Sequence, residues 1–207
     1  IDIGYFLMSD IHIYRGNDGA CFSYTIAQKD KVINVNMLTA EILTYIDHIS
    51  DETNYKDTVT EIIKFTESCQ NNDGSWWYSH HYSNGAPKKQ LDFHQGYVLE
   101  SLKRVGRIRV DLEARIESMI KRGDKFYLET ILDTEVGRAF WRYPKKFPID
   151  IHNQAQAIIW LSLSGRTSLA ERFVKYTLKN FWSKRNRYFF YQKYPFFTNR
   201  TNYMRWS

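Results

Sequence analysis

The chain has 207 residues, of which 43% are hydrophobic and 25% charged, and its formal net charge is +6 at pH 7. This composition is ordinary for a globular protein. Its two cysteines, Cys21 and Cys69, are far apart and in no Cys-x-x-Cys pattern, which argues against a disulfide framework or a structural zinc site and favours a cytoplasmic protein. The longest apolar stretches are about ten residues, too short to span a bilayer.

A three-residue polar signature recurs at an interval of 58 residues, at 34–36, 92–94 and 150–152. A fixed period of this size indicates stacked supersecondary units. Each signature is followed by an apolar helix, a turn and a more amphipathic helix. The expected helices, in chain order, are 37–49, 55–68, 96–105, 112–131, 155–163 and 168–181, with the second turn at 104–107.

An aromatic, β-like connection closes each unit, at 75–78, 140–143 and 188–191. Inner and outer helices in alternation predict an all-α array of helical hairpins that curves into part of a ring, an incomplete α/α toroid. Chain length and period give about three and a half hairpins. We therefore expect one domain over 1–207 that is truncated at both ends, a view to which the start at Ile1 rather than Met contributes.

The signature residues have two readings. Asn34, Asp92 and Asp150 each precede a helix and belong to the types favoured as N-caps. Alternatively, Asp92 with His94 and Asp150 with His152 place a carboxylate and an imidazole together at one mouth of the ring, where they could perform acid–base catalysis on a sugar. No third metal ligand stands at a typical spacing, so we expect no metal and no cofactor.

Aromatic residues are abundant, with 13 Phe, 15 Tyr and 6 Trp. Their faces suit core packing, an interface or the stacking of sugar rings. Buried amides either bond neighbouring helices or bind a ligand. The aligned helix N-termini favour an anionic ligand such as a uronate. The candidate substrate-binding residues are Tyr24, Asn34, Asn36, Trp76, Trp77, Tyr97, Gln154, Gln156, Tyr191 and Arg205.

Two further segments leave alternatives open. The polar loop 79–90, with His80 and His81, either contacts ligand or is a mobile surface loop. The segment 181–207 holds six Lys or Arg and no Asp or Glu. This segment is either a solvated basic face or a contact for an acidic partner. Because it has no recognisable nucleic-acid-binding motif, we expect that the protein does not bind nucleic acid.

Residues 70–76, Gln-Asn-Asn-Asp-Gly-Ser-Trp, match the Gln-x-x-x-Gly-x-Trp pattern of α/α-toroid proteins, which include terpenoid cyclases and protein prenyltransferases. The resemblance implies that Gln70 and Trp76 tie the end of an outer helix to the following turn. The segments 21–25, 92–100, 148–158 and 203–206 resemble a poorly characterised group of toroid proteins associated with polysaccharide genes.

The sequence lacks motifs of some of these families, which limits the functions that the resemblance implies. The Asp-rich motif of terpene cyclases and the Asp/Cys/His zinc set of prenyltransferases are absent, which disfavours terpene chemistry. Glucuronyl hydrolases and N-acylglucosamine 2-epimerases are similar in architecture and act on sugars. Two hypotheses follow: a protein that processes or binds an anionic, uronate-type glycan in polysaccharide metabolism, or a non-catalytic scaffold of a polysaccharide-assembly pathway. The sequence leaves catalysis and the oligomeric state open.

Overall fold

The computed structural model describes residues 3–50, 54–81 and 85–201. The chain divides into two compact units, Ile1–Lys125 and Phe126–Ser207, each of which is described by itself. The single domain expected over 1–207 stays a prediction. No helix of the described residues is long and apolar enough to cross a membrane.

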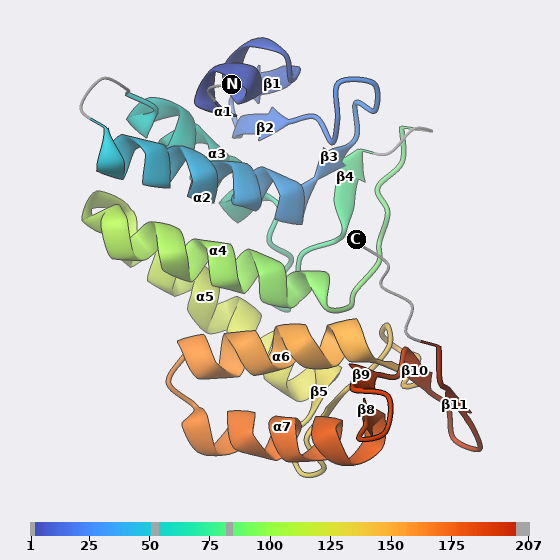
Figure 1. Cartoon of the computed structure of the whole chain (residues 1–207). Helices are drawn as coiled ribbons and strands as arrows, with labels where there is room; N and C mark the ends of the chain where they lie inside the picture. Colours follow the sequence, from blue (N-terminus) through green and yellow to red (C-terminus); the bar gives the residue numbers. More distant parts are fainter. Residues whose placement is uncertain (1–2, 51–53, 82–84, 202–207) are drawn as a thin grey trace. The chain divides into compact units, whose positions relative to one another are not determined.

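The first unit contains two helical hairpins, preceded by a short helix and a β-hairpin (Figure 1). Helix α2 packs against both α3 and α4, and strand β3 pairs with β4. The elements are α1 (Ile3–Ser9), β1 (Ile13–Gly16), β2 (Gly19–Phe22), β3 (Lys31–Val32), α2 (Ile33–Ile49), α3 (Lys56–Ser68), β4 (Ser79–His81), α4 (His94–Ile108), the 3₁₀ turn η1 (Val110–Leu112) and α5 (Glu113–Phe126), whose last residue already belongs to the second unit.

The second unit contains one helical hairpin and several two-residue strands. Helix α6 packs against α7, and β7 pairs with β10 immediately before α6 begins. The elements are the π-helical turn η2 (Tyr127–Ile131), β5 (Leu132–Asp133), β6 (Arg138–Ala139), β7 (Ile149–Asp150), α6 (Ile151–Leu163), α7 (Thr167–Phe181), β8 (Trp182–Ser183), β9 (Tyr188–Phe189), β10 (Gln192–Lys193) and β11 (Thr198–Asn199).

The helix pattern agrees with the sequence-based prediction except at α4, which was expected to be apolar on most sides and carries one apolar stripe. Helices α2 and α6 are apolar around most of their circumference, whereas α3, α5 and α7 each carry one apolar stripe. A further expectation is wrong: α4 continues to Ile108, so Gly106 lies inside the helix and not in a turn at 104–107. A Cβ at Gly106 would lie 3.1 Å from the side chain of Ile116, so the glycine lets α4 approach the next helix closely.

Buried amides form the actual structural repeat. Asn36, Gln95 and Gln154 occur at intervals of 59 residues near the start of α2, α4 and α6, and each is at most 1% exposed. Each amide binds the backbone of the segment before its helix. Asn36 accepts from Phe22 N at 3.0 Å and donates to Ala20 O at 3.2 Å.

Gln95 and Gln154 make the equivalent bonds. Gln95 accepts from Trp76 N at 2.9 Å and donates to Trp76 O at 2.6 Å. Gln154 accepts from Ala139 N and donates to Gly137 O at 3.2 Å. Because unpaired buried backbone groups are costly, this tie fixes each connection against its inner helix.

The Gln-x-x-x-Gly-x-Trp segment has the structural role that the resemblance implied. Gln70 Nε2 donates to Gly74 O at 2.9 Å and to Met119 O at 3.0 Å, and the Trp76 indole donates to Thr66 O at 2.9 Å. Gly74 has a φ of +91°, and a Cβ there would overlap the Arg122 carbonyl of α5. The motif thus ties the end of α3 to the following turn, as predicted.

Candidate functional site

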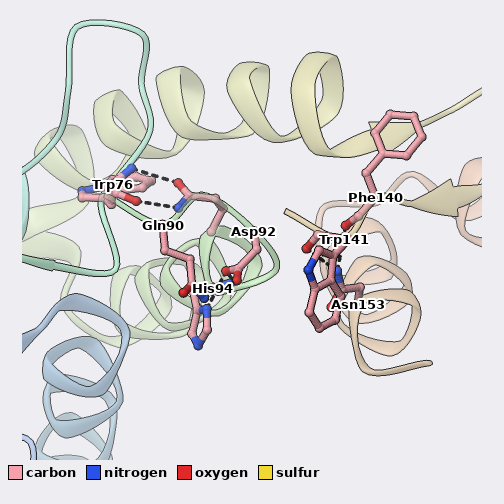
Figure 2. A network of polar contacts seen from close by, with 8 residues as sticks. Trp76, Gln90, Asp92, His94, Phe140, Trp141 and Asn153 are labelled. Atoms are coloured by element: carbon pink, nitrogen blue, oxygen red, sulfur yellow. Dashed lines mark hydrogen bonds and ion pairs between the residues drawn. The ribbon is translucent and has the colours of Figure 1, made fainter. Parts of the chain in front are cut away.

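The first unit contains an aspartate–histidine pair at the start of α4. Asp92 Oδ1 accepts from His94 N at 3.2 Å and lies 2.5 Å from His94 Nδ1. Asp92 Oδ2 accepts from Gln90 Nε2 at 2.5 Å. Figure 2 shows the side chains of Gln90 and His94 directed at the Asp92 carboxylate. The N-cap residue of α4 is Phe93, so Asp92 is not the cap that its position suggested; it lies one residue earlier, accepts from the first N–H of the helix and is the partner of an imidazole.

The environment of this pair defines which atoms carry protons. Burial by itself raises the pKa of Asp92, but the hydrogen bonds and charge of His94 and the bond from Gln90 outweigh it, so the pKa lies below its ordinary value. The carboxylate is ionised at neutral pH, so His94 Nδ1 donates the proton between them. In neutral His94 the Nε2 atom is then the proton acceptor. The Asp92 side chain is only 3% exposed and that of His94 16%, so the imidazole is the accessible member.

Aromatic rings hold the imidazole in place. The His94 ring stacks on Phe93 at 4.1 Å between centroids and meets the edge of Tyr78 at 4.8 Å. The carbonyl of Tyr78 accepts from Ile33 N, which brings the start of α2 to this site. Asn34 is the second residue of α2, whose N-cap is Val32, so the expected capping role of Asn34 is wrong. Its side chain is 9% exposed, and its Oδ1 has no hydrogen-bond partner among the described residues.

Tyr78 belongs to a group that we call the lysine–aromatic ledge: Trp77, Tyr78, Lys88 and Lys89. Of these four residues, Tyr78 contacts the imidazole. Lys88 Nζ lies 4.6 Å from the centroid of Tyr78, the same ring that contacts His94, and Lys89 Nζ lies 4.5 Å from that of Trp77. Trp77 stacks on His80 at 5.6 Å. Lys89 has no carboxylate partner within the described parts of the chain. The ledge combines positive charge with aromatic faces, which suits an anionic sugar.

A second polar cluster joins α2 to α4 and was not anticipated from the sequence. Glu41 accepts from Ser101 Oγ at 2.9 Å and lies 3.5 Å from Arg104, which also binds Glu100 at 2.9 Å. Burial raises the pKa of Glu41 despite the opposing bond from Ser101 and charge of Arg104. Burial also raises the pKa of Tyr97, with Glu100 adding to it. The signal available in the sequence was Glu41, a charged residue between apolar neighbours in the middle of α2.

In the second unit the same sequence pattern places Asp150 at the start of α6. Asp150 caps α6: its Oδ1 accepts from His152 N at 2.8 Å and its Oδ2 from Gln192 Nε2 at 2.9 Å. Asp150 is 3% exposed. Asn153 donates to the carbonyls of Phe140 and Trp141 at 2.7 and 3.0 Å, so this amide secures the aromatic connection (Figure 2). The carboxylate thus has a clear capping role.

Several predicted ligand-binding residues have structural roles instead. Asn36, Trp76 and Gln154 are at most 1% exposed and their polar groups bind the protein backbone, so we leave them out of the proposed site. Gln156 is 1% exposed. Half-buried side chains that stay candidates are those of Tyr24, Trp77, Tyr97, His152 and Tyr191. Arg205 lies outside the described residues.

An open hollow of about 660 Å³ occurs in the second unit between the end of η2, β5 and the start of α7. Glu129, Lys146 and Arg166 line it, and none of the predicted site residues does. Among the described residues, no three His, Cys, Asp or Glu side chains are grouped so that they could hold a metal ion.

The comparisons with known proteins find similarity in structure but none in sequence families. No protein-family model and no curated protein matches the sequence. Cellobiose 2-epimerase from Bacillus thermoamylovorans is similar with a TM-score of 0.76 and 11% identity, over 96% of this chain and 58% of that one. An inactive variant of the GH76 α-1,6-mannanase of Salegentibacter sp., in complex with α-1,6-mannotriose, gives a TM-score of 0.68 and 10% identity, over 95% and 55%.

Unsaturated glucuronyl hydrolase from Bacillus sp., responsible for the degradation of glycosaminoglycan, gives a TM-score of 0.60 and 10% identity, over 74% of this chain and 48% of that one. All three are six-hairpin α/α toroids, so the chain has the fold of this superfamily, as its sequence pattern indicated. The chain spans about half the length of these structures.

Proposed function

We propose that the chain processes or binds an anionic, uronate-type glycan, with His94 as the acid–base group. The arrangement that supports this proposal most strongly is the buried Asp92 bonded to the accessible imidazole of His94, next to the lysine–aromatic ledge. Sugar-active enzymes with the same fold, one of which acts on a glucuronyl compound, add support for the class of ligand.

The mechanism that we propose uses the imidazole rather than two carboxylates. Asp92 and Asp150 are 2% and 3% exposed, so neither oxygen pair is open to a substrate in the way that a two-carboxylate glycosidase requires. Asp92 instead fixes the orientation and tautomer of His94, and Nε2 takes a proton from the substrate or returns one to it. A positioned acid or base of this kind contributes about 10²–10⁴-fold to a rate.

The preference for an anion rests on the ledge. Lys88 and Lys89 place two ammonium groups over aromatic rings, and Tyr78 connects one of them to His94. A carboxylate on the sugar would bind these ammonium groups while the sugar ring stacks on Trp77. Because the ledge is partly exposed, each lysine should contribute only about 2–5-fold to affinity at physiological salt.

A binding experiment tests the choice of ligand. Calorimetric titration with oligosaccharides that contain a uronate, and with their neutral counterparts, should show tighter binding of the former. Lys89→Met should weaken binding of the anionic sugar alone. Lys121→Met removes the same charge from an exposed position of α5 outside the ledge and serves as the control. Equal affinity for the charged and neutral sugars would reject the proposal of an anionic ligand.

A non-catalytic scaffold of a polysaccharide-assembly pathway is the second candidate. The structural bonds of Asp92 and Asp150 favour it, because Asp150 caps α6 and Asp92 accepts from the first N–H of α4. Binding of a glycan without turnover, equal in wild type and His94→Gln, would support this alternative and remove the catalytic one.

A further inference from the structure

The second unit repeats the backbone arrangement that carries the lysine–aromatic ledge in the first. Strand β3 pairs with β4 just before α2 (Figure 1), and strand β7 pairs with β10 just before α6. The first residue of each helix donates to a tyrosine carbonyl at 3.1 Å, and the donor–acceptor pairs are Ile33 N with Tyr78 O and Ile151 N with Tyr191 O. Tyr78 and Tyr191 therefore occupy equivalent positions in the two units.

Beyond each tyrosine the chain turns back and pairs with itself. The residue after the tyrosine is the first member of an antiparallel pair, and the two pairs are Ser79 with Lys88 and Gln192 with Asn199. A cation follows the second member of the pair in both units, Lys89 in the first and Arg200 in the second. Lys89 and Arg200 are therefore equivalent as well.

In both units this cation lies over the ring of the residue before the tyrosine. Lys89 Nζ is 4.5 Å from the centroid of Trp77, and the guanidinium carbon of Arg200 is 5.7 Å from that of Phe190. A cation at such a distance from an aromatic centroid is attracted by the ring. The lysine–aromatic ledge thus has a counterpart in the second unit, which we call the second ledge: Phe190, Tyr191 and Arg200.

Hydrogen bonds hold the second ledge to the start of α6. Gln192 of β10 donates to Asp150 Oδ2 at 2.9 Å, and Asp150 is the N-cap of α6. Tyr188 donates its hydroxyl to Arg200 O at 3.0 Å, and its ring meets the edge of Phe190 at 5.9 Å between centroids. A ledge whose backbone is already fixed loses less conformational entropy when a ligand binds, which favours binding.

Charge and exposure define the kind of ligand that the second ledge fits. Arg200 is exposed, whereas Phe190 and Tyr191 are half-buried. Residues 181–201 contain five Lys or Arg and no Asp or Glu, and Arg200 forms no ion pair with any residue that the structure describes. A guanidinium can bind a carboxylate through two parallel hydrogen bonds, and aromatic rings offer a surface for a sugar. The second ledge therefore suits an anionic sugar, as the lysine–aromatic ledge does.

We propose that the second ledge is a separate binding site for an anionic glycan, in which Arg200 contacts the carboxylate of a uronate. The class of ligand rests on the function proposed for the first unit. The site itself rests on the matching backbone bonds and cation–ring contacts, which are found within each unit by itself. Acid–base catalysis stays with His94 of the first unit, so the second ledge binds a glycan without converting it. Two uronates can then bind to one chain.

Backbone nuclear magnetic resonance of the 207-residue chain, with glucuronate as the probe, tests the second site. Glucuronate should shift the amide signals of Tyr191 and Gln192 as well as those of Trp77 and Tyr78, and glucose, which has no carboxylate, should shift both groups less. Arg200→Met should weaken the affinity measured from Tyr191 and Gln192 by about 2–5-fold, because an exposed charge contributes modestly at physiological salt. The affinity measured from Trp77 and Tyr78 should not change.

Two further variants serve as controls, and unchanged signals elsewhere in the spectrum show that each variant is folded. Arg185→Met removes the same charge from an exposed position between β8 and β9 and should leave both affinities unchanged. Lys89→Met should weaken binding at the lysine–aromatic ledge alone. Glucuronate shifts confined to the lysine–aromatic ledge, or equal losses with Arg185→Met and Arg200→Met, would overturn this inference and leave the proposed function standing. Shifts at neither ledge would reject both.

Discussion

Replacing Gln95 with leucine removes the amide that holds the turn before α4, while keeping a side chain of similar size. Both Gln95 and Trp76 are 1% exposed, and the amide satisfies both backbone groups of Trp76, at 2.9 and 2.6 Å. The substitution leaves an N–H and a C=O buried without these partners. Each such group costs about 1–3 kcal/mol, so we expect a loss of about 2–6 kcal/mol in the free energy of unfolding. That loss is a large fraction of the free energy of unfolding of a typical domain, which is about 5–15 kcal/mol.

Urea denaturation followed by circular dichroism measures this loss. Gln28→Leu is the matched control, because Gln28 is exposed and its side chain makes no hydrogen bond in the described structure; its effect should stay within about 0.5 kcal/mol. A Gln95→Leu variant that loses less than about 1 kcal/mol would refute the claim that the repeated amides hold the connections.

Three further predictions concern single residues. Asp92 has a pKa below its ordinary value of 3.8, so its charge stabilises the fold above pH 3.8. This stabilisation is lost as the pH falls through the pKa of the folded state. The loss in free energy of unfolding caused by Asp92→Asn, measured in urea, should therefore be larger at pH 7 than at pH 3. Gly74→Ala should cost more than about 1 kcal/mol in the same assay, whereas Gly16→Ala, whose Cβ meets no atom within 4 Å, should change little; equal effects would contradict the close approach. Cys21 and Cys69 are buried free thiols, and burial raises the pKa of both, that of Cys69 to about 12. In the native protein they should therefore react with a thiol reagent far more slowly than in urea.

Helical periodicity predicted the helices well, because a helix that buries one face has apolar residues at the spacing of the helical turn. The predicted helix 168–181 corresponds to α7 at Thr167–Phe181. The turn expected at 104–107 failed because Gly106 serves close packing against Ile116, a role that the sequence of one helix does not reveal.

The repeat was found from the sequence, but its structural meaning was not. The 58-residue interval selects Asp92 and Asp150, each of which accepts from an N–H at the start of a helix. The amides that bind the connections follow at intervals of 59 residues, as Asn36, Gln95 and Gln154. These amides bind backbone groups, so no pattern of partner side chains in the sequence could have predicted the bonds.

The candidate site was predicted in part. The pair Asp92 and His94 was identified, and the structure bonds the two side chains directly. At the identical spacing, Asp150 accepts from His152 N and from Gln192 Nε2, and the spacing gave no sign of the bond from Gln192. The lysines of the ledge were not predicted, because their position over Tyr78 and Trp77 depends on the pairing of Lys88 with Ser79 of β4.

The most direct test of the account is turnover by wild type and His94→Gln of a panel of uronate-containing oligosaccharides, monitored by nuclear magnetic resonance. We predict that wild type converts at least one of them, and that His94→Gln binds it comparably but converts it at least about 100-fold more slowly. Undiminished conversion by His94→Gln, or no conversion by wild type of any sugar that it binds, would contradict the assignment of His94 as the acid–base group.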